Sequence, residues 1–277
     1  MNYASVMVYM DDRAVGERRL SLASEIAVRF DARVLGIMGS PAESPVIDAY
    51  TGGAMLGEML SLVRDVAEAD LKKAELAFWE GAGARAASFE WRGATGYPCE
   101  VVGHAMRAAD LIILGRRDRE TLSAHAIDPG DLLMIAGRPL LIAPPHPLRG
   151  PIGEPAVVAW TDSREAQRAV QGALPMLKAA SRVDVIEIAA EDGFAAAQTR
   201  TVDVADFLGR YGIVAAGQAI RGDGSARSEQ IIGFAEDCSA GLIVAGGYGH
   251  ARLRQWVLGG VTHGLLANSP VCLILSH

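Results

Sequence analysis

The sequence is poor in lysine and has no excess of basic charge. Among its 277 residues the only lysines are Lys72, Lys73 and Lys178, so chemistry built on a phosphate-loop lysine or a lysine Schiff base has almost no place here. The 26 Lys and Arg residues face 33 Asp and Glu, which gives a net charge of −7. This balance argues against nucleic acid as a partner, because binding to phosphate backbones needs a basic surface.

Cysteines and uninterrupted apolar runs are also scarce. Cys99, Cys238 and Cys272 lie far apart without a C-x-x-C spacing, a pattern typical of buried thiols in a reducing compartment and not of a zinc site. The uncharged run 255–277 is long enough to span a bilayer, but glycine, asparagine and proline interrupt it, so we expect a loop, a helix and a strand instead. No export signal precedes the first acidic residues, and we therefore expect a cytoplasmic protein with no membrane partner.

Short apolar runs alternate with amphipathic stretches along the whole chain. This order is typical of β-α-β units around a parallel sheet and predicts an α/β fold. In the second half, the predicted strands are 156–160, 183–189, 213–220, 241–246 and 270–275. The predicted helices of that half are 164–179, 198–210, 226–238 and 260–267.

The two halves of the sequence match each other. Residues 109–115 resemble 240–246, and residues 138–142 resemble 269–273, in both cases with an offset of 131. A proline-rich stretch between them reads as a linker, which predicts two tandem domains, 1–147 and 151–277. The first half differs by an extra segment over 41–57, followed by a long helix near 57–80.

A glycine-rich loop follows the predicted fourth strand of the second half. Gly246 is followed after two residues by Gly249 and after nine more by Gly259, where a helix begins. Gly246 and Gly249 let the backbone approach a ligand closely or take a positive φ, and free N–H groups at a helix N-terminus favour an anion. Asp237 is the last acidic residue, so the region after it is locally basic. The pattern predicts a phosphate-binding loop.

This spacing, its flanking apolar strands and the tandem organisation resemble the universal stress protein family. The resemblance implies two five-stranded, Rossmann-like domains of the adenine nucleotide alpha hydrolase-like type, with ATP, with or without Mg²⁺, held between the first and fourth strands. It also implies pairing of the two domains through their last strands, and it leaves a homodimer open. Many members of the family bind no nucleotide.

Two positions depart from the family pattern. The hydroxyl residue after the third glycine is replaced by Gly260, with Thr262 close behind, and the first-strand aspartate is replaced by Thr161, followed directly by Asp162. Asp162 with Ser163 also reads as a helix N-cap. For His250, contact with a phosphate and simple exposure remain equally open. The candidate nucleotide-binding residues are Thr161, Asp162, Gly246, Gly249, His250, Arg252, Gly259, Gly260, Val261 and Thr262; no catalytic or metal-binding residue is predicted.

The first domain lacks the motif. At the same offset Gly249, Gly259 and Gly260 become Asp118, Asp128 and Pro129, which place carboxylates where phosphates would lie and remove an amide donor. Asp11, at the first-strand position, survives. We therefore expect this domain to be a degenerate partner that does not bind ATP.

The loop offers a phosphate cradle without evident catalytic groups. This favours a stress-response protein that binds ATP or another adenine nucleotide in its second domain and acts as a sensor or regulator, with at most slow ATP hydrolysis. A nucleotide-free scaffold that mediates protein–protein interaction is the alternative. An NAD-dependent enzyme is disfavoured, because the dinucleotide fingerprint would need Gly or Ala at Arg252 and should follow a first strand.

Overall fold

We analysed a computed structural model of the chain, which describes residues 2–11, 13–42, 53–83, 88–116, 123–146, 150–222, 226–248 and 260–277. The strands are β1 (Ser5–Tyr9), β2 (Arg33–Ser40), β3 (Phe89–Thr95), β4 (Leu111–Gly115), β5 (Leu140–Ala143), β6 (Ala156–Ala159), β7 (Val183–Ala189), β8 (Ala215–Arg221), β9 (Leu242–Gly246) and β10 (Cys272–Ser276). The helices are α1 (Arg13–Phe30), α2 (Gly53–Ala82), α3 (Pro98–Ala105), α4 (Pro129–Ile135), α5 (Arg164–Ala179), α6 (Phe194–Gly209), α7 (Arg227–Asp237) and α8 (Gly260–Asn268).

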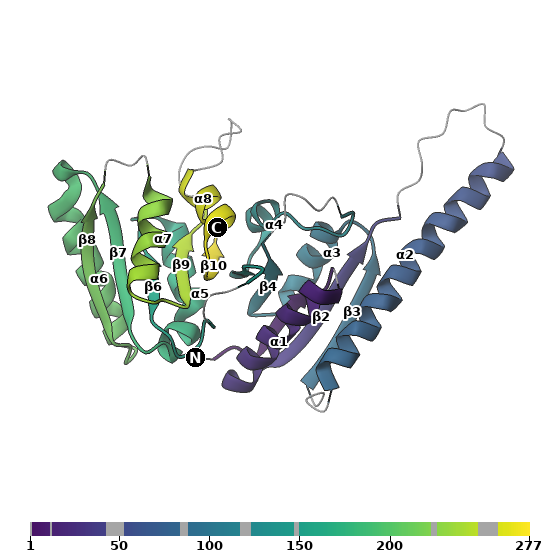
Figure 1. The fold of residues 1–277 in the computed structure, drawn as a ribbon, viewed down its shortest axis with the longest axis horizontal. Coiled ribbons are helices and arrows are strands. Elements are labelled where there is room, and N and C mark those ends of the chain that lie inside the picture. The colour runs from purple at the N-terminus through teal and green to yellow at the C-terminus, as the bar shows by residue number, and fades with distance from the viewer. Residues whose placement is uncertain are drawn as a thin grey trace.

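The strands form one sheet in the order β3-β2-β1-β4-β5-β10-β9-β6-β7-β8 (Figure 1). Every neighbouring pair is parallel except β5 and β10, which run antiparallel. Helices α1, α2, α5 and α6 cover one face and α3, α4, α7 and α8 the other, so central strands such as β4 and β9 are apolar on both sides, whereas the edge strands β3 and β8 are partly exposed. The predicted α/β fold class is confirmed.

Element boundaries follow local signals in the second half. Ser163 accepts a hydrogen bond from the Ala166 amide and caps α5, which occupies the predicted range 164–179. Helix α6 begins at Phe194 and not at residue 198, because a 3₁₀ turn over Glu191–Gly193 runs directly into it. The predicted helix and strand within the uncharged run are present as α8 and β10. None of the helices in the described ranges combines the length and apolar character that a bilayer crossing requires.

The duplication is visible in the structure. Strands β4 and β9 begin 131 residues apart, at Leu111 and Leu242, and α4 and α8 begin at residues 129 and 260. In the first half, α2 is longer than predicted and begins at Gly53, so part of the extra segment belongs to the helix; residues 43–52 lie outside the described residues.

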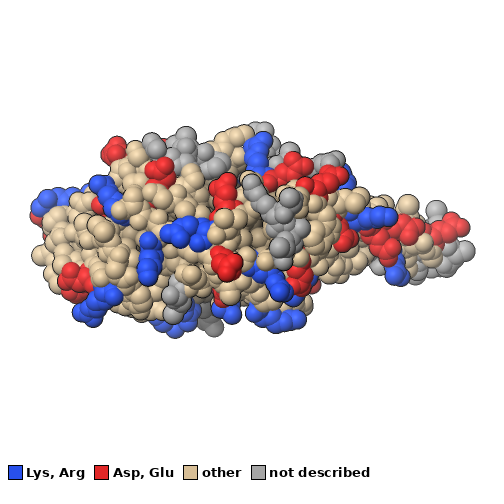
Figure 2. Space-filling view, turned by 90° about the horizontal axis from the view of Figure 1, so that it is seen from below, with Lys and Arg blue, Asp and Glu red and all other residues tan. Residues whose placement is uncertain are grey.

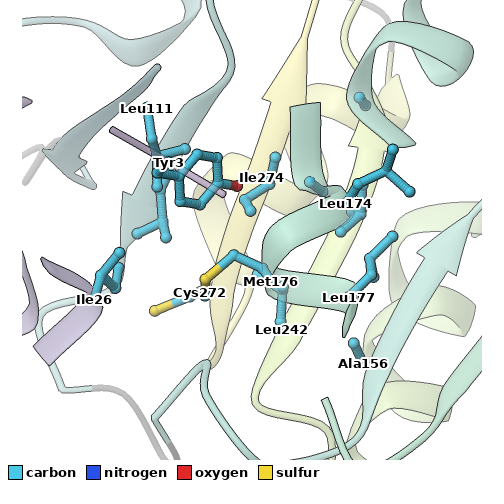
Figure 3. Packing of buried hydrophobic residues seen from close by; sticks show 14 of the residues in the cluster. Tyr3, Ile26, Leu111, Ala156, Leu174, Met176, Leu177, Leu242, Cys272 and Ile274 are labelled. Carbon is cyan, nitrogen blue, oxygen red and sulfur yellow. The ribbon is translucent and has the colours of Figure 1, made fainter. Parts of the chain in front are cut away.

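The two halves of the sheet meet at β5 and β10. Leu141 faces Ile274 across this antiparallel ladder. Beside it, the Tyr3 hydroxyl donates to the Gly172 carbonyl at 2.8 Å, and a Cβ on Gly172 would lie 2.9 Å from Pro139. Figure 3 shows that Tyr3 reaches from the first half toward Ile274 and α5, so apolar packing continues across the junction. The domain limits 1–147 and 151–277 themselves stay a prediction.

Candidate nucleotide-binding site

The order of the strands reverses at β6, which lies between β9 and β7. In parallel sheets, ligands bind beyond the carboxyl ends of the strands at such a switch point. Ala159 at the end of β6 pairs with Ala245 of β9, so Thr161 and Gly246 follow at the same sheet edge. We call this edge, formed by the ends of β6 and β9, the C-terminal switch point.

Gly246 is required here by a close approach between two backbones. A Cβ at this position would lie 2.6 Å from the Ala166 amide nitrogen and 2.9 Å from the Glu165 carbonyl carbon, at the start of α5. Gly246 does not take a positive φ; in the described part of the loop that conformation belongs to Tyr248, with φ of 55°. Gly246 therefore brings the end of β9 against the first turn of α5.

Thr161, Asp162 and Ser163 form the turn between β6 and α5. The hydroxyl oxygens of Thr161 and Ser163 lie 3.3 Å apart, and Ser163 is the N-cap, as its position before the helix indicated. Thr161 and Asp162 are exposed. The pKa of the Arg200 guanidinium is raised, first by its hydrogen bond to Glu187 and to a smaller extent by the charge of Asp162. The turn thus presents a hydroxyl and a carboxylate at the C-terminal switch point.

Helix α8 begins at the same site. Apart from the adjoining chain and the backbone of α8 itself, no described atom lies within 4 Å of the place where a Gly260 Cβ would stand. Val261 is half-buried and Thr262 is buried. The Thr262 hydroxyl oxygen accepts a hydrogen bond from the Tyr248 amide at 3.3 Å, which joins the glycine loop to α8. The remaining predicted residues, Gly249, His250, Arg252 and Gly259, lie outside the described residues.

Two amides of the loop are already bonded. The Gly247 amide donates to the Ser276 carbonyl at 2.8 Å, and the Tyr248 amide donates to Thr262. The first N–H groups of α8 have no partner within the helix, as in any α-helix. A phosphate at this site would therefore meet α8 and not the Gly247 and Tyr248 amides. Within the described ranges, no group of three His, Cys, Asp or Glu side chains is placed to hold a metal ion.

Tyr248 is a residue that the sequence analysis missed. Its ring packs on the apolar cluster beside α4, and a Cβ on Gly130 would lie 2.6 Å from its hydroxyl oxygen. Burial raises the pKa of the Tyr248 phenol, and the charges of Asp128 and Asp131 raise it further. The glycine loop of the second half therefore contacts the first turn of α4 in the first half. The one signal in the sequence was a large aromatic residue between glycines.

Comparison with solved structures identifies the fold. No family model and no curated protein matches the sequence. A universal stress protein from Archaeoglobus fulgidus DSM 4304 aligns with 98% of this chain and 95% of its own, at 18% identity and a TM-score of 0.67. The chain has the fold of the universal stress proteins. The resemblance stated from the glycine spacing is confirmed at this level.

Two further matches were found. A functionally unknown protein from Pseudomonas aeruginosa PAO1 aligns with 98% of this chain and 92% of its own, at 15% identity and a TM-score of 0.58. A universal stress protein in complex with cAMP aligns with 51% of this chain and 97% of its own, at 21% identity and a TM-score of 0.35.

This universal stress protein fold has a second switch point in the first half, between the ends of β1 and β4. There the Arg19 guanidinium occupies the space over Gly115, where it meets the position of a Cβ on that glycine, and it forms an ion pair with Asp11. Arg19 is buried, with 3% exposure. The surviving first-strand aspartate is thus engaged by an arginine of its own chain.

His125 covers the neighbouring strand ends. Its Nε2 lies 3.1 Å from the Ser40 hydroxyl at the end of β2 and 3.3 Å from a carboxylate oxygen of Asp70 in α2. Its carbonyl accepts a hydrogen bond from the Tyr9 hydroxyl at 2.6 Å, at the end of β1. Both partners of the ring meet the same nitrogen, so the group lacks the Ser-His-Asp relay in which the two imidazole nitrogens have different partners.

Two amide positions in the first turn of α4 are also unavailable to a ligand. Asp128 caps this helix by accepting a hydrogen bond from the Gly130 amide at 2.8 Å, and Pro129 has no amide hydrogen to give. Asp118 lies outside the described residues. Arg19 and His125 therefore lie over the strand ends of this N-terminal switch point, and their side chains add a steric obstacle to the charge repulsion expected from the sequence.

We expect this universal stress protein fold to lose stability at alkaline pH because its buried tyrosines ionise more readily in the unfolded chain. Burial raises the pKa of Tyr3 and Tyr9 above the ordinary value of 10.0, and the pKa of Tyr248 is raised too. Because the folded values exceed the unfolded ones, this stability is fully present below pH 10 and is lost as the pH rises towards the folded values. Each such tyrosine adds about 1.4 kcal/mol of loss per pH unit in that window.

Urea unfolding at stepped pH, followed in parallel with tyrosinate absorbance, measures this effect. In the Tyr3→Phe variant, the free energy of unfolding should fall less steeply with rising pH, by about 1.4 kcal/mol per pH unit. Ionisation of all tyrosines while the protein stays folded would contradict the expectation.

Proposed function

We propose that the chain is a cytoplasmic stress-response protein that binds ATP, or another adenine nucleotide, at its C-terminal switch point and acts as a sensor or regulator. One observation carries the proposal: among the described residues, the two switch points related by the duplication differ in the groups that lie over them. Arg19 and His125 fill the first, whereas the second presents glycine, hydroxyl groups and the start of α8. The free cysteines fit a reducing compartment.

The phosphates are proposed to lie on the N-terminus of α8. Gly260 and Val261 would offer amides, and the Thr262 hydroxyl, whose oxygen is held by the Tyr248 amide, retains a proton to donate. Thr161 and Asp162 would face the ribose or adenine. Gly246 would position these two parts, while Gly249, His250, Arg252 and Gly259 complete the loop. Mg²⁺ could accompany the phosphates and would bind through them.

A regulatory role fits the groups at this site. The described residues there are glycines, hydroxyls and one exposed carboxylate, and no lysine lies near them in the sequence; the cationic candidates Arg252 and His250 lie outside the described residues. Fast phosphoryl transfer needs a positioned base or water-orienting group together with cationic stabilisation of the transition state. The contact of Tyr248 with α4 gives a route by which occupancy of the second domain would be felt in the first.

Calorimetric titration of the full chain with ATP, with and without Mg²⁺, tests the proposal, and one site per chain is expected. Gly260→Asp adds a carboxylate at the proposed phosphate position, where described atoms leave room for a side chain. Like charges about 4 Å apart repel by about 1–4 kcal/mol, which is roughly a five- to thousandfold loss of affinity. An acidic residue in the first turn should not weaken the helix itself.

Gly137→Asp is the matched control, because it adds the same charge at another open glycine, in the first domain. It should leave the affinity unchanged. Absence of binding would overturn the proposal, and equal binding by Gly260→Asp would place the phosphates elsewhere.

A nucleotide-free scaffold is the second candidate. The observation that favours it is that the Gly247 and Tyr248 amides already have partners within the chain. The same titration separates the two, because a scaffold gives no heat with any adenine nucleotide and is indifferent to Gly260→Asp.

A further inference from the structure

We infer that α2 is a dimerisation surface, on which a second copy of this chain docks its own α2 in antiparallel orientation. The inference goes beyond the proposed function and does not depend on nucleotide binding. It follows from the length of α2, the spacing of its exposed apolar residues and the arrangement of its charges.

Helix α2 is longer than the strands that it covers. Its 30 residues extend about 45 Å, whereas the eight residues of β2 extend about 27 Å. The ring contacts with the sheet come from the C-terminal half, where Phe78 packs on Phe89 and Trp91 with centroids 5.6 Å and 5.4 Å apart. Figure 1 shows the other half projecting from the body of the molecule. That half has little of the protein's own core to cover.

One side of the helix carries a row of exposed residues that repeat every three or four positions. We call this row the seam; it consists of Met59, Leu62, Val66, Ala69, Lys73 and Leu76. Exposed fractions of 63% at Leu62, 54% at Val66 and 56% at Leu76 are high for apolar side chains on a helix. A 3–4 spacing of apolar residues is the pattern of a two-stranded coiled coil.

The seam is separate from the side that faces the sheet. Ala67, Ala77 and Phe78 are buried against the rest of the chain and do not belong to it. Lys73 breaks the apolar character of the seam, but its alkyl stem can pack while the ammonium group reaches solvent. The seam can therefore receive a second helix without disturbing the fold.

The charges beside the seam favour a second copy of the chain as the partner. If two copies of α2 cross antiparallel about the point between residues 67 and 68, Met59 meets the partner's Leu76, Val66 meets the partner's Ala69, and Leu62 meets the alkyl stem of the partner's Lys73. Exposed Asp65 then faces the partner's Lys72, and the twofold axis repeats this pair. Opposite charges flanking the seam set orientation and register in coiled coils. Figure 2 shows acidic and basic side chains interleaved along the projecting end.

Other arrangements of the same seam place like charges together. A shift of one heptad in either direction sets Asp65 against the partner's Asp65, or Lys72 against the partner's Lys72. A parallel pair brings Asp65 opposite the partner's Asp70. Only the central antiparallel register avoids these contacts, so the surface is complementary to itself and commits to a second copy of the chain.

Sedimentation equilibrium of the full chain tests the inference, and a reversible dimer is expected. Asp65→Lys and Lys72→Asp should each weaken dimerisation by at least about tenfold, since each turns two attractive pairs into repulsive ones. The double variant should restore it, and an equimolar mixture of the two single variants should form a heterodimer. Glu68→Lys, which reverses an exposed charge that does not flank the seam, is the control and should not alter the dimer.

Leu62→Glu should abolish the dimer while far-ultraviolet circular dichroism shows the monomer still folded. A wild-type chain that stays monomeric overturns the inference. A dimer that is indifferent to Leu62→Glu, or that the double charge reversal fails to restore, overturns it as well, because another surface or another register would then hold the copies together.

Discussion

Asp11→Ala is expected to lower the free energy of unfolding by about 3–5 kcal/mol, because it leaves the buried Arg19 guanidinium without its counter-charge. The Arg19 side chain is 4% exposed and that of Asp11 is 22% exposed. Among the described residues, Arg19 Nε is buried without a hydrogen-bond partner, so the ion pair provides much of what stabilises this charge. Urea unfolding monitored by circular dichroism measures the loss.

The matched control lies at the equivalent turn of the second half. Asp162 is exposed, so Asp162→Ala should change stability by no more than about 0.5 kcal/mol. Replacing both partners of the buried pair, with Asp11→Leu and Arg19→Met, should recover most of the stability that the single change loses, because no uncompensated charge remains. If Asp11→Ala were as mild as Asp162→Ala, Arg19 would not depend on Asp11.

The ion pair between Arg19 and Asp11 could not be predicted from the sequence. The degenerate first domain was predicted from Asp118, Asp128 and Pro129, which occupy positions that the duplication equates with glycines. Arg19 gave no such signal, because it lies beside Arg18 and Glu17 in a helix where charged residues usually face solvent. Only the packing of α1 over the end of β4 turns this arginine inward, and such tertiary contacts are not encoded in local spacing.

The secondary structure of the second half was more predictable for a physical reason. Its central strands β6 and β9 are apolar on both faces and Ser163 caps α5, so local and tertiary preferences agree at these elements. Tyr248 is the exception. Its positive φ is unfavourable for a non-glycine residue, and the hydrogen bond to Thr262 and the packing beside α4 offset that cost. Neither contact could be anticipated without knowing how the two halves meet.

Gly246→Ala is expected to cost about 1–3 kcal/mol of stability and to displace the first turn of α5. The added methyl group would lie 2.6 Å from the Ala166 amide nitrogen, and this neighbour is backbone, which cannot rotate away as a side chain can. Helix α5 cannot retreat easily either, because Ala169, Val170 and Ala173 on its inner side are buried. Urea unfolding together with hydrogen exchange at the α5 amides measures both effects.

Gly115→Ala, at the equivalent position of the first half, shows how the effect differs when the added methyl group meets a side chain and not a backbone. The three atoms nearest to its methyl group all belong to the Arg19 side chain. The combined change Asp11→Leu and Arg19→Met should therefore relieve Gly115→Ala, whereas no side-chain replacement on α5 should relieve Gly246→Ala. Gly233→Ala, on a helix position with open space, is the control and should be neutral or stabilising by about 0.5–1 kcal/mol. A Gly246→Ala protein as stable as wild type, with unchanged exchange at Ala166, would show that the two backbones are free to separate and that Gly246 does not fix the C-terminal switch point.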